Sequence, residues 1–311
     1  MKNFLIGAII LDIIKRAFEE SVKGGILTKT HVESRLFSFY AGGGTLDLAV
    51  FPNSLAQLIN VANIIKKNSV EFLIIGACSN TLIRDSGYSG ISLMTKFLND
   101  ICISENFLTA LSGTRLQTVI SEARRNGLSG IEDLAGIPAS IGGAVVMNSG
   151  ACGTEICQLV EKISFLDLSD LQIKEVLSSD VPFEYRSSNA FFNDKIITSV
   201  MFKLKSENQA KISDRINSAL ARRRNTQPSE PSLGCVFKKI NGFSAGCYVE
   251  AAGLKGTRIG GAEISVKHAN FIINTGNGTA SDYIALVEIA ENLVQSKFNI
   301  TLNREILIKG D

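Results

Sequence analysis

The stretch GIEDLAGIPASIGGAVVMNSGACGTEI, residues 130–156, decides the fold of this chain, because it crowds glycines and small side chains into one segment. Pro138 fixes a turn within it. A backbone without side-chain bulk can approach a flat ligand closely, or it can pack tightly on a sheet. The glycines on which this argument rests are Gly136, Gly142, Gly143, Gly150 and Gly153.

An earlier loop, GACSN at residues 76–80, follows the apolar run EFLII. Such a loop can turn several backbone N–H groups inward and bind phosphate, with serine and asparagine side chains as further donors. The residues that follow, TLIRD, look extended, so a helix dipole does not contribute. Taken by itself, this loop predicts an ordinary tight turn. Two such segments together favour a long ligand with a pyrophosphate and a ring system, such as a dinucleotide.

The composition narrows the class of protein. The chain has 311 residues, which predicts two or three domains, and 45% of them are hydrophobic. A net charge of +2 gives no basic field for nucleic acid. The six cysteines form no CxxC pair, which favours a reduced, cytoplasmic protein, and the two histidines are too far apart in sequence to suggest a metal site. Residues 1–20 suggest an amphipathic helix, too short to span a bilayer.

Periodicity predicts a mixed order of helices and strands. Helices are expected over residues 54–67 (with Ser54 as the N-cap), 114–127, 206–228, 247–253 and 280–299. Strands are expected over residues 39–52 on both sides of a glycine turn, and over 71–76, 90–97, 108–113, 160–168, 174–186, 196–205, 262–274 and 301–310. A domain boundary is placed near residue 205.

Six separated motifs carry a family resemblance. They are GACSNTLIRDSGYSG, the glycine-rich segment 130–153, EYRSS, TQPSEPSLGCVFKK, GLKGTRIGGAEISVKHANFIINTGNGTASD and LNREILIKG. In this order they resemble the UDP-N-acetylenolpyruvoylglucosamine reductases (MurB), in the shorter variant of that family. The resemblance runs from about residue 36 to the end of the chain.

The resemblance implies an α+β fold. A two-lobed FAD-binding domain of the vanillyl-alcohol-oxidase (PCMH) type would occupy residues 31–204, and a smaller α/β substrate-binding domain residues 205–311, after an N-terminal helical extension over 1–30. It also implies a two-stage reaction of peptidoglycan precursor synthesis. NADPH reduces bound FAD, and the flavin passes a hydride to UDP-N-acetylglucosamine enolpyruvate, which yields UDP-N-acetylmuramate. A monomer without membrane or nucleic-acid partners is expected.

The cofactor contacts implied by the resemblance lie in three segments. They are Gly43, Gly44, Gly76, Ala77, Cys78, Ser79, Asn80, Thr81, Gly136, Ile137, Pro138, Ser140, Gly142, Gly143, Ala144, Asn148, Gly150 and Ala151. Substrate contacts are expected from Tyr185, Arg186, Gln227 and Lys238, and His268 is interpreted as structural. No metal is expected.

Three residues match the family's catalytic positions. Arg186 would face the substrate carboxylate, where a guanidinium fork suits a carboxylate and its enolate, and Glu305 would help to stabilise that enolate. Cys235 stands where the family has a serine proton donor. A thiol, with an ordinary pKa of ~8.5, is a stronger acid than an alcohol, so the role is retained. The alternatives are a charge at a strand end for Arg186, an exposed ion pair for Glu305 and a buried structural thiol for Cys235.

Several positions depart from the family pattern. Ala41 stands in place of an arginine, Cys78 in place of a glycine, and Lys239 in place of an asparagine. These departures leave two other functions open: an FAD-dependent oxidase on the same flavin domain, and a flavin-binding protein whose activity has decayed. The C-terminal motifs argue against the oxidase.

Overall fold

The computed structural model describes residues 25–311, so the helix expected at the N-terminus lies outside the described residues. Contacts between residues divide the protein into two compact units, and each unit is built from segments that alternate along the sequence. Unit 1 comprises residues 1–30, 47–77 and 90–221, and unit 2 comprises residues 31–46, 78–89 and 222–311. Each unit has its own hydrophobic core.

The first described strand is β1 (Leu27–Glu33), although residues up to 30 were expected to belong to a helical extension. Its β-branched Thr28, Thr30 and Val32 favour a strand. The strand expected at Phe39–Tyr40 is absent among the described residues. That stretch is a turn, and Tyr40 is fully buried in the core of unit 2.

A four-stranded sheet has the order β1-β2-β5-β3, formed by β1, β2 (Thr45–Phe51), β5 (Tyr88–Met94) and β3 (Phe72–Ile75). Helix α2 (Leu55–Asn68) begins at Ser54, whose side chain accepts a hydrogen bond from the Gln57 amide, as the N-cap prediction requires. Its buried face, with Leu58, Val61 and Ile65, joins the apolar core beneath this sheet. Gly76 directly follows β3, so the sheet fixes its position in unit 1.

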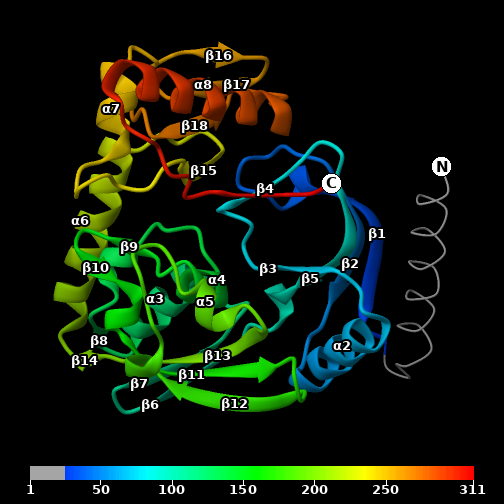
Figure 1. The fold of residues 1–311 in the computed structure, drawn as a ribbon. Coiled ribbons are helices and arrows are strands. Elements are labelled where there is room, and N and C mark those ends of the chain that lie inside the picture. The colour runs from blue at the N-terminus through cyan, green and yellow to red at the C-terminus, as the bar shows by residue number, and fades with distance from the viewer. Residues whose placement is uncertain (1–24) are drawn as a thin grey trace. The chain divides into compact units, whose positions relative to one another are not determined.

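The larger sheet of unit 1 is antiparallel, with the order β12-β11-β13-β7-β6. Its strands are β6 (Ile101–Ser104), β7 (Phe107–Leu111), β11 (Val160–Asp167), β12 (Gln172–Leu177) and β13 (Lys195–Lys203). Helices α3 (Leu116–Arg125) and α4 (Ile141–Val146) add their apolar residues to its core, and α4 lies on β13 and β7 (Figure 1). The short elements β8 (Leu128–Ser129), β9 (Gly150–Ala151), β10 (Thr154–Glu155), α5 (Asn189–Phe192) and β14 (Lys205–Ser206) lie between or after these strands. The long helix α6 (Gln209–Thr226) follows them.

Unit 2 contains an antiparallel sheet with the order β15-β18-β17-β16. Its strands are β15 (Ser232–Cys235), β16 (Arg258–Ile259), β17 (Ala262–Ile264) and β18 (Phe271–Asn274). Helix α8 (Ala280–Phe298) lies along β16 and β17, and α7 (Ala245–Ala251) packs against α8 (Figure 1). A parallel pair joins β4 (Thr81–Ile83) to β19 (Leu307–Lys309), so the loop after residue 78 meets the C-terminal strand.

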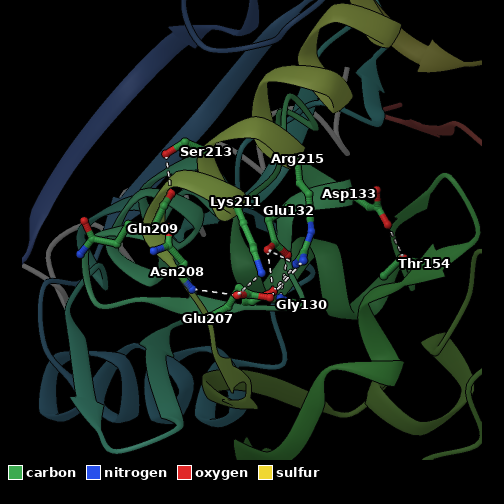
Figure 2. A network of polar contacts seen from close by, with 11 residues as sticks. Gly130, Glu132, Asp133, Thr154, Glu207, Asn208, Gln209, Lys211, Ser213 and Arg215 are labelled. Carbon is green, nitrogen blue, oxygen red and sulfur yellow. Dashed lines mark hydrogen bonds and ion pairs between the residues drawn. The ribbon is translucent and has the colours of Figure 1, made fainter.

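A polar network fixes the start of α6 in unit 1 (Figure 2). Glu132 is only 4% exposed, and its carboxylate accepts hydrogen bonds from Ser129 Oγ at 2.7 Å and the Gly130 amide at 2.6 Å. Arg215 Nη1 donates to Ser129 Oγ at 2.7 Å and lies 3.3 Å from Glu132. Its Nη2 contacts Glu207 at 3.3 Å. The buried carboxylate is thus paired and hydrogen-bonded.

Replacing Arg215 with alanine is expected to lower the free energy of unfolding by about 1–2 kcal/mol, because a buried carboxylate loses its cation while keeping two donors. Urea denaturation followed by circular dichroism measures this loss. Lys211→Ala is the control: Lys211 is 68% exposed and lies 3.6 Å from Glu207. Its loss should stay below ~0.5 kcal/mol. Equal losses for the two variants would contradict the role given to Arg215.

Candidate functional site

The two glycine segments meet within unit 1. A Cβ atom placed on Gly76 would lie 2.0 Å from Ser140 Oγ, so only glycine fits at the end of β3. Ser140 caps α4, and its hydroxyl accepts a hydrogen bond from the Gly143 amide at 3.4 Å. Two segments separated by more than sixty residues in sequence are therefore packed directly against each other at Gly76 and Ser140.

The residues that follow β7 hold the start of helix α4 through backbone hydrogen bonds. The Ile141 amide donates to the Thr114 carbonyl at 2.9 Å, and the Gly142 amide donates to the Ser112 carbonyl at 2.8 Å. A Cβ on Gly142 would lie 3.0 Å from Ser112 Cβ. The first amides of this short helix are thus used within the protein.

Gly43 and Gly44, expected to contact the cofactor, approach protein backbone in unit 2. A Cβ on Gly43 would lie 2.6 Å from the Ile83 carbonyl oxygen, and one on Gly44 would lie 2.3 Å from that of Arg84. The Gly44 amide also donates to the Arg84 carbonyl at 3.1 Å. The fold alone therefore requires small residues here.

Cys78 takes the left-handed conformation, with φ of 50°, which explains why a glycine suits this position. Its side chain is 5% exposed. Its thiol lies 3.4 Å from the Thr81 carbonyl and forms a hydrogen bond with Ser38. Burial raises the pKa of the Cys78 thiol to about 12. The side chain therefore points into unit 2 and leaves the neighbouring Ala77 and Ser79 half-buried at the loop surface.

Alkylation of Cys78 by iodoacetamide in the native protein is expected to stay negligible and not to rise between pH 7 and pH 9, because the raised pKa keeps the thiol protonated there. The exposed Cys102 and Cys247 should react. Peptide mapping by mass spectrometry measures each site. Labelling of Cys78 at the rate of Cys102 would show that the loop opens readily.

Arg186 is fixed to the second glycine segment. Its guanidinium donates to the Asn148 carbonyl at 3.3 Å and the Gly150 carbonyl at 2.9 Å, and lies 3.9 Å from the Glu155 carboxylate. It also covers the Tyr185 ring, 4.9 Å from its centroid. Arg186 has φ of 57°, an uncommon backbone conformation that clusters at functional sites. These contacts hold the guanidinium in one orientation, which does not fit a solvated surface charge.

Cys235 is the last residue of β15, and it pairs with Phe271 of β18. The next two residues are clamped by Asn270. Its carbonyl accepts the Val236 amide at 2.8 Å, its Oδ1 accepts the Phe237 amide at 3.0 Å, and its Nδ2 donates to the Phe237 carbonyl at 2.9 Å. Cys235 is half-buried and so remains reachable, unlike Cys78.

Behind Cys235 lie two buried tyrosines of unit 2. Tyr40 and Tyr283 pack edge to face, with centroids 4.9 Å apart, and Tyr283 is fully buried. Burial, with the Tyr40 phenol and the Cys235 thiol nearby, raises the pKa of Tyr283 well above its usual value. The Tyr283 phenol therefore stays neutral and places no negative charge near the Cys235 thiol.

Glu305 lies beside the Cys235 segment. Its amide donates to the Val236 carbonyl at 2.7 Å, and its carbonyl accepts Asn80 Nδ2 at 3.0 Å. Glu305 precedes β19 and is half-buried, although a strand had been expected from residue 301 onward. Arg304 forms a bidentate pair with Glu291, both contacts at 2.6 Å, so it is engaged elsewhere rather than with its neighbour Glu305.

The remaining expected residues, Lys238, Gln227 and His268, belong to unit 2. The Lys238 amide donates to the Asn303 carbonyl at 2.8 Å, so Lys238 lies on the same pair of segments as Cys235 and Glu305. Gln227 follows the end of α6. His268 Nδ1 accepts the Asn270 amide at 3.2 Å, and burial lowers the pKa of His268. This neutral acceptor suits the structural role expected of it.

The structure thus brings the expected residues together in two groups. Gly76, the segment 136–151, Tyr185 and Arg186 belong to unit 1, and Cys235, Lys238 and Glu305 belong to unit 2. Sequence reasoning missed Asn270, which holds Val236 and Phe237, and it missed the bond from Asn80 to the Glu305 carbonyl. An asparagine directly before a buried strand was the only signal for Asn270.

Comparisons with known proteins first define the class. Residues 46–170 match the model of an FAD binding domain, and residues 227–309 match the C-terminal domain of UDP-N-acetylenolpyruvoylglucosamine reductase. The first match spans both glycine segments and the second spans Cys235 and Glu305. The chain is therefore a flavoprotein with a flavin domain followed by a C-terminal domain, and the expected α+β fold is confirmed.

Relatives then give the family. A UDP-N-acetylenolpyruvoylglucosamine reductase of Clostridium novyi is 36% identical over 294 residues, which cover 94% of each chain, and one of Lactobacillus helveticus is 36% identical over 93% of this chain and 97% of its own. The crystal structure of that reductase (MurB) from Thermus caldophilus superposes with a TM-score of 0.80 at 29% identity, and covers 91% of this chain and 99% of its own. The chain belongs to the UDP-N-acetylenolpyruvoylglucosamine reductase family.

Family membership confirms the expected resemblance, enzyme class and cofactors, FAD and NADPH. It does not favour the oxidase or the decayed flavin protein. Among residues 25–311, no helix is long and apolar enough to cross a membrane.

Proposed function

We propose that this protein reduces UDP-N-acetylglucosamine enolpyruvate to UDP-N-acetylmuramate, with Cys235 as the proton donor. The observation that supports it most is the 2.7 Å hydrogen bond from the Glu305 amide to the Val236 carbonyl. It sets Glu305 beside the segment that carries Cys235. A carboxyl group and a thiol are then available in unit 2 for one reacting carbon.

The loop after β3 fits FAD. Gly76 carries no side chain, and the half-buried Ala77 and Ser79 would offer backbone and hydroxyl donors for a pyrophosphate. Cys78 does not crowd that loop, because its thiol is turned inward. When bound, FAD would supply the redox chemistry, which is the transfer of a hydride equivalent from NADPH to the methylene carbon of the enol ether.

Arg186 and Glu305 meet the charge that then develops. Negative charge appears at the carbon next to the methylene and spreads into the substrate carboxylate. The Arg186 guanidinium, held by the Asn148 and Gly150 carbonyls, presents a planar fork that suits this carboxylate. Glu305, in its protonated form, would donate a hydrogen bond to the enolate. Both act on charge that is larger in the transition state than in the substrate.

Cys235 completes the reaction with its proton. The S–H bond breaks, the proton bonds to the carbon of the enolate, and the thiolate regains a proton from solvent, which can reach this half-buried residue. One NADPH and one solvent proton are consumed for each product molecule. The thiol is a stronger acid than the family's serine hydroxyl, so the transfer remains feasible.

This proposal is tested by anaerobic turnover with NADPH and UDP-N-acetylglucosamine enolpyruvate. Mass spectrometry should find one UDP-N-acetylmuramate for each NADPH oxidised. NADPH oxidation that requires oxygen and gives no UDP-N-acetylmuramate would refute it and favour an oxidase.

The domain roles are part of the same proposal: residues 31–204 bind FAD, and residues 205–311 bind the substrate. Substrate contacts come from Gln227 and Lys238 of the second range and from Tyr185 of the first. The matched ranges 46–170 and 227–309 support this assignment. We also infer a cytoplasmic monomer, which sedimentation and cell fractionation would test.

A further inference from the structure

Asn148 is the most fully engaged polar residue of the second glycine segment. It is 1% exposed and takes the left-handed conformation, with φ of 40°. Its Nδ2 donates to Glu155 Oε2 at 2.9 Å and to the Glu184 carbonyl at 3.0 Å, and its Oδ1 accepts the Cys157 amide at 3.4 Å. Its own carbonyl accepts Arg186 Nη1 at 3.3 Å.

These bonds use both donors of the side-chain amide and one acceptor site of Oδ1. An asparagine has two N–H donors, and both of those of Asn148 are used within the protein. Asn148 was expected to contact the cofactor. A buried amide with both donors engaged has none left for FAD, so a different role must explain it.

Both acceptors of the Asn148 Nδ2 group lead to the turn that carries Arg186. The Glu184 carbonyl belongs to that turn, which is closed by the bridge between Glu184 and Ser187. The Glu155 carboxylate that accepts from Asn148 also lies 3.9 Å from Arg186. One amide thus ties the turn to the glycine segment and orients the carboxylate that flanks the guanidinium.

We propose that the Asn148 side chain is a positioning residue that holds the Arg186 turn for binding of the substrate carboxylate. The inference rests on the proposed function for what Arg186 binds. If Asn148 positions Arg186, its loss should weaken substrate binding. If Asn148 contacted the cofactor, its loss should weaken FAD binding. Measuring both affinities therefore distinguishes the two roles.

The test uses Asn148→Gly and Asn148→Asp in the full chain. Glycine adopts φ of 40° without strain, so it removes the side chain alone, and aspartate keeps the shape but loses both donors. The control is Asn299→Gly. Asn299 is another left-handed asparagine, with φ of 53°, at the exposed end of α8.

We expect both Asn148 variants to raise the KM for UDP-N-acetylglucosamine enolpyruvate about tenfold or more, because orientation of the guanidinium is lost. The FAD dissociation constant, from titration of the apoprotein, should stay within about twofold, as should both constants for Asn299→Gly. A KM that does not change, or an FAD constant that rises as much as the KM, would overturn the inference. If one variant does not fold, the other decides.

A second readout does not depend on turnover. Phenylglyoxal modifies accessible guanidinium groups, and peptide mapping locates them. Arg186 should react slowly in the parent protein and several-fold faster in Asn148→Gly. An equal rate in both proteins would overturn the positioning role. Absence of turnover by the parent protein would refute the proposed function alone, since this comparison would still decide the inference.

Discussion

Replacing Cys235 with alanine is expected to slow the substrate-driven reoxidation of reduced flavin by about 10²–10⁴-fold, the usual contribution of a general acid. Reduction by NADPH should remain at the parent rate, because no proton from Cys235 enters that stage. Rapid mixing under anaerobic conditions separates the two rates. The side chain lies at the half-buried end of β15, and Asn270 holds the segment after it through main-chain bonds that alanine leaves intact.

Two further variants make this result specific. Cys235→Ser restores a donor of the family's type and should recover most of the reoxidation rate. Cys247→Ala removes an exposed thiol and should change neither stage. Reoxidation of the Cys235→Ala flavin at the parent rate would show that the thiol is a structural residue and that another group supplies the proton.

Replacing Arg186 with lysine is expected to lower kcat/KM for the enolpyruvyl substrate by about 10²–10³-fold, the effect of removing a donor that stabilises an oxyanion. Lysine keeps the charge but cannot bond the Asn148 and Gly150 carbonyls and a carboxylate at the same time with a planar fork. The φ of 57° at this position disfavours both residues alike, so backbone strain does not differ.

The control for this substitution is Arg125→Lys. Arg125 also lies in unit 1, but it is 66% exposed and pairs with Glu122 at the end of α3. Its kcat/KM should stay within about twofold of the parent value. If kcat/KM of Arg186→Lys also stays within about twofold of the parent value, Arg186 only holds the glycine segment in place and does not contribute to catalysis.

Elements with strong local signals could be predicted from the sequence. Helix α2 begins at Ser54 as expected, because its cap bond is formed by residues three apart. Helix α8 and strands β11 and β13 follow from long periodic patterns. The turn at Tyr40 could not be predicted. An aromatic beside small residues looks like a strand, and only its burial against Tyr283, far along the chain, makes it a turn.

The chemistry of the site could be predicted in part. Residue types and the family resemblance indicated Arg186, Cys235 and Glu305, and Gly76 and Ser140 do come together. The roles of Asn80, Asn148 and Asn270 could not be predicted, because each depends on which carbonyl its amide reaches in the folded chain. Such partners lie 33 or more residues away in sequence. Only tertiary structure sets those distances.

The central claim is that this chain carries out both halves of the reduction. Anaerobic double mixing tests it most directly: the flavoprotein is reduced with one equivalent of NADPH, UDP-N-acetylglucosamine enolpyruvate is added, and the absorbance of oxidised flavin is followed. We expect the band to bleach and then to return in step with UDP-N-acetylmuramate formation. A band that bleaches and stays bleached in the presence of the substrate would contradict the account.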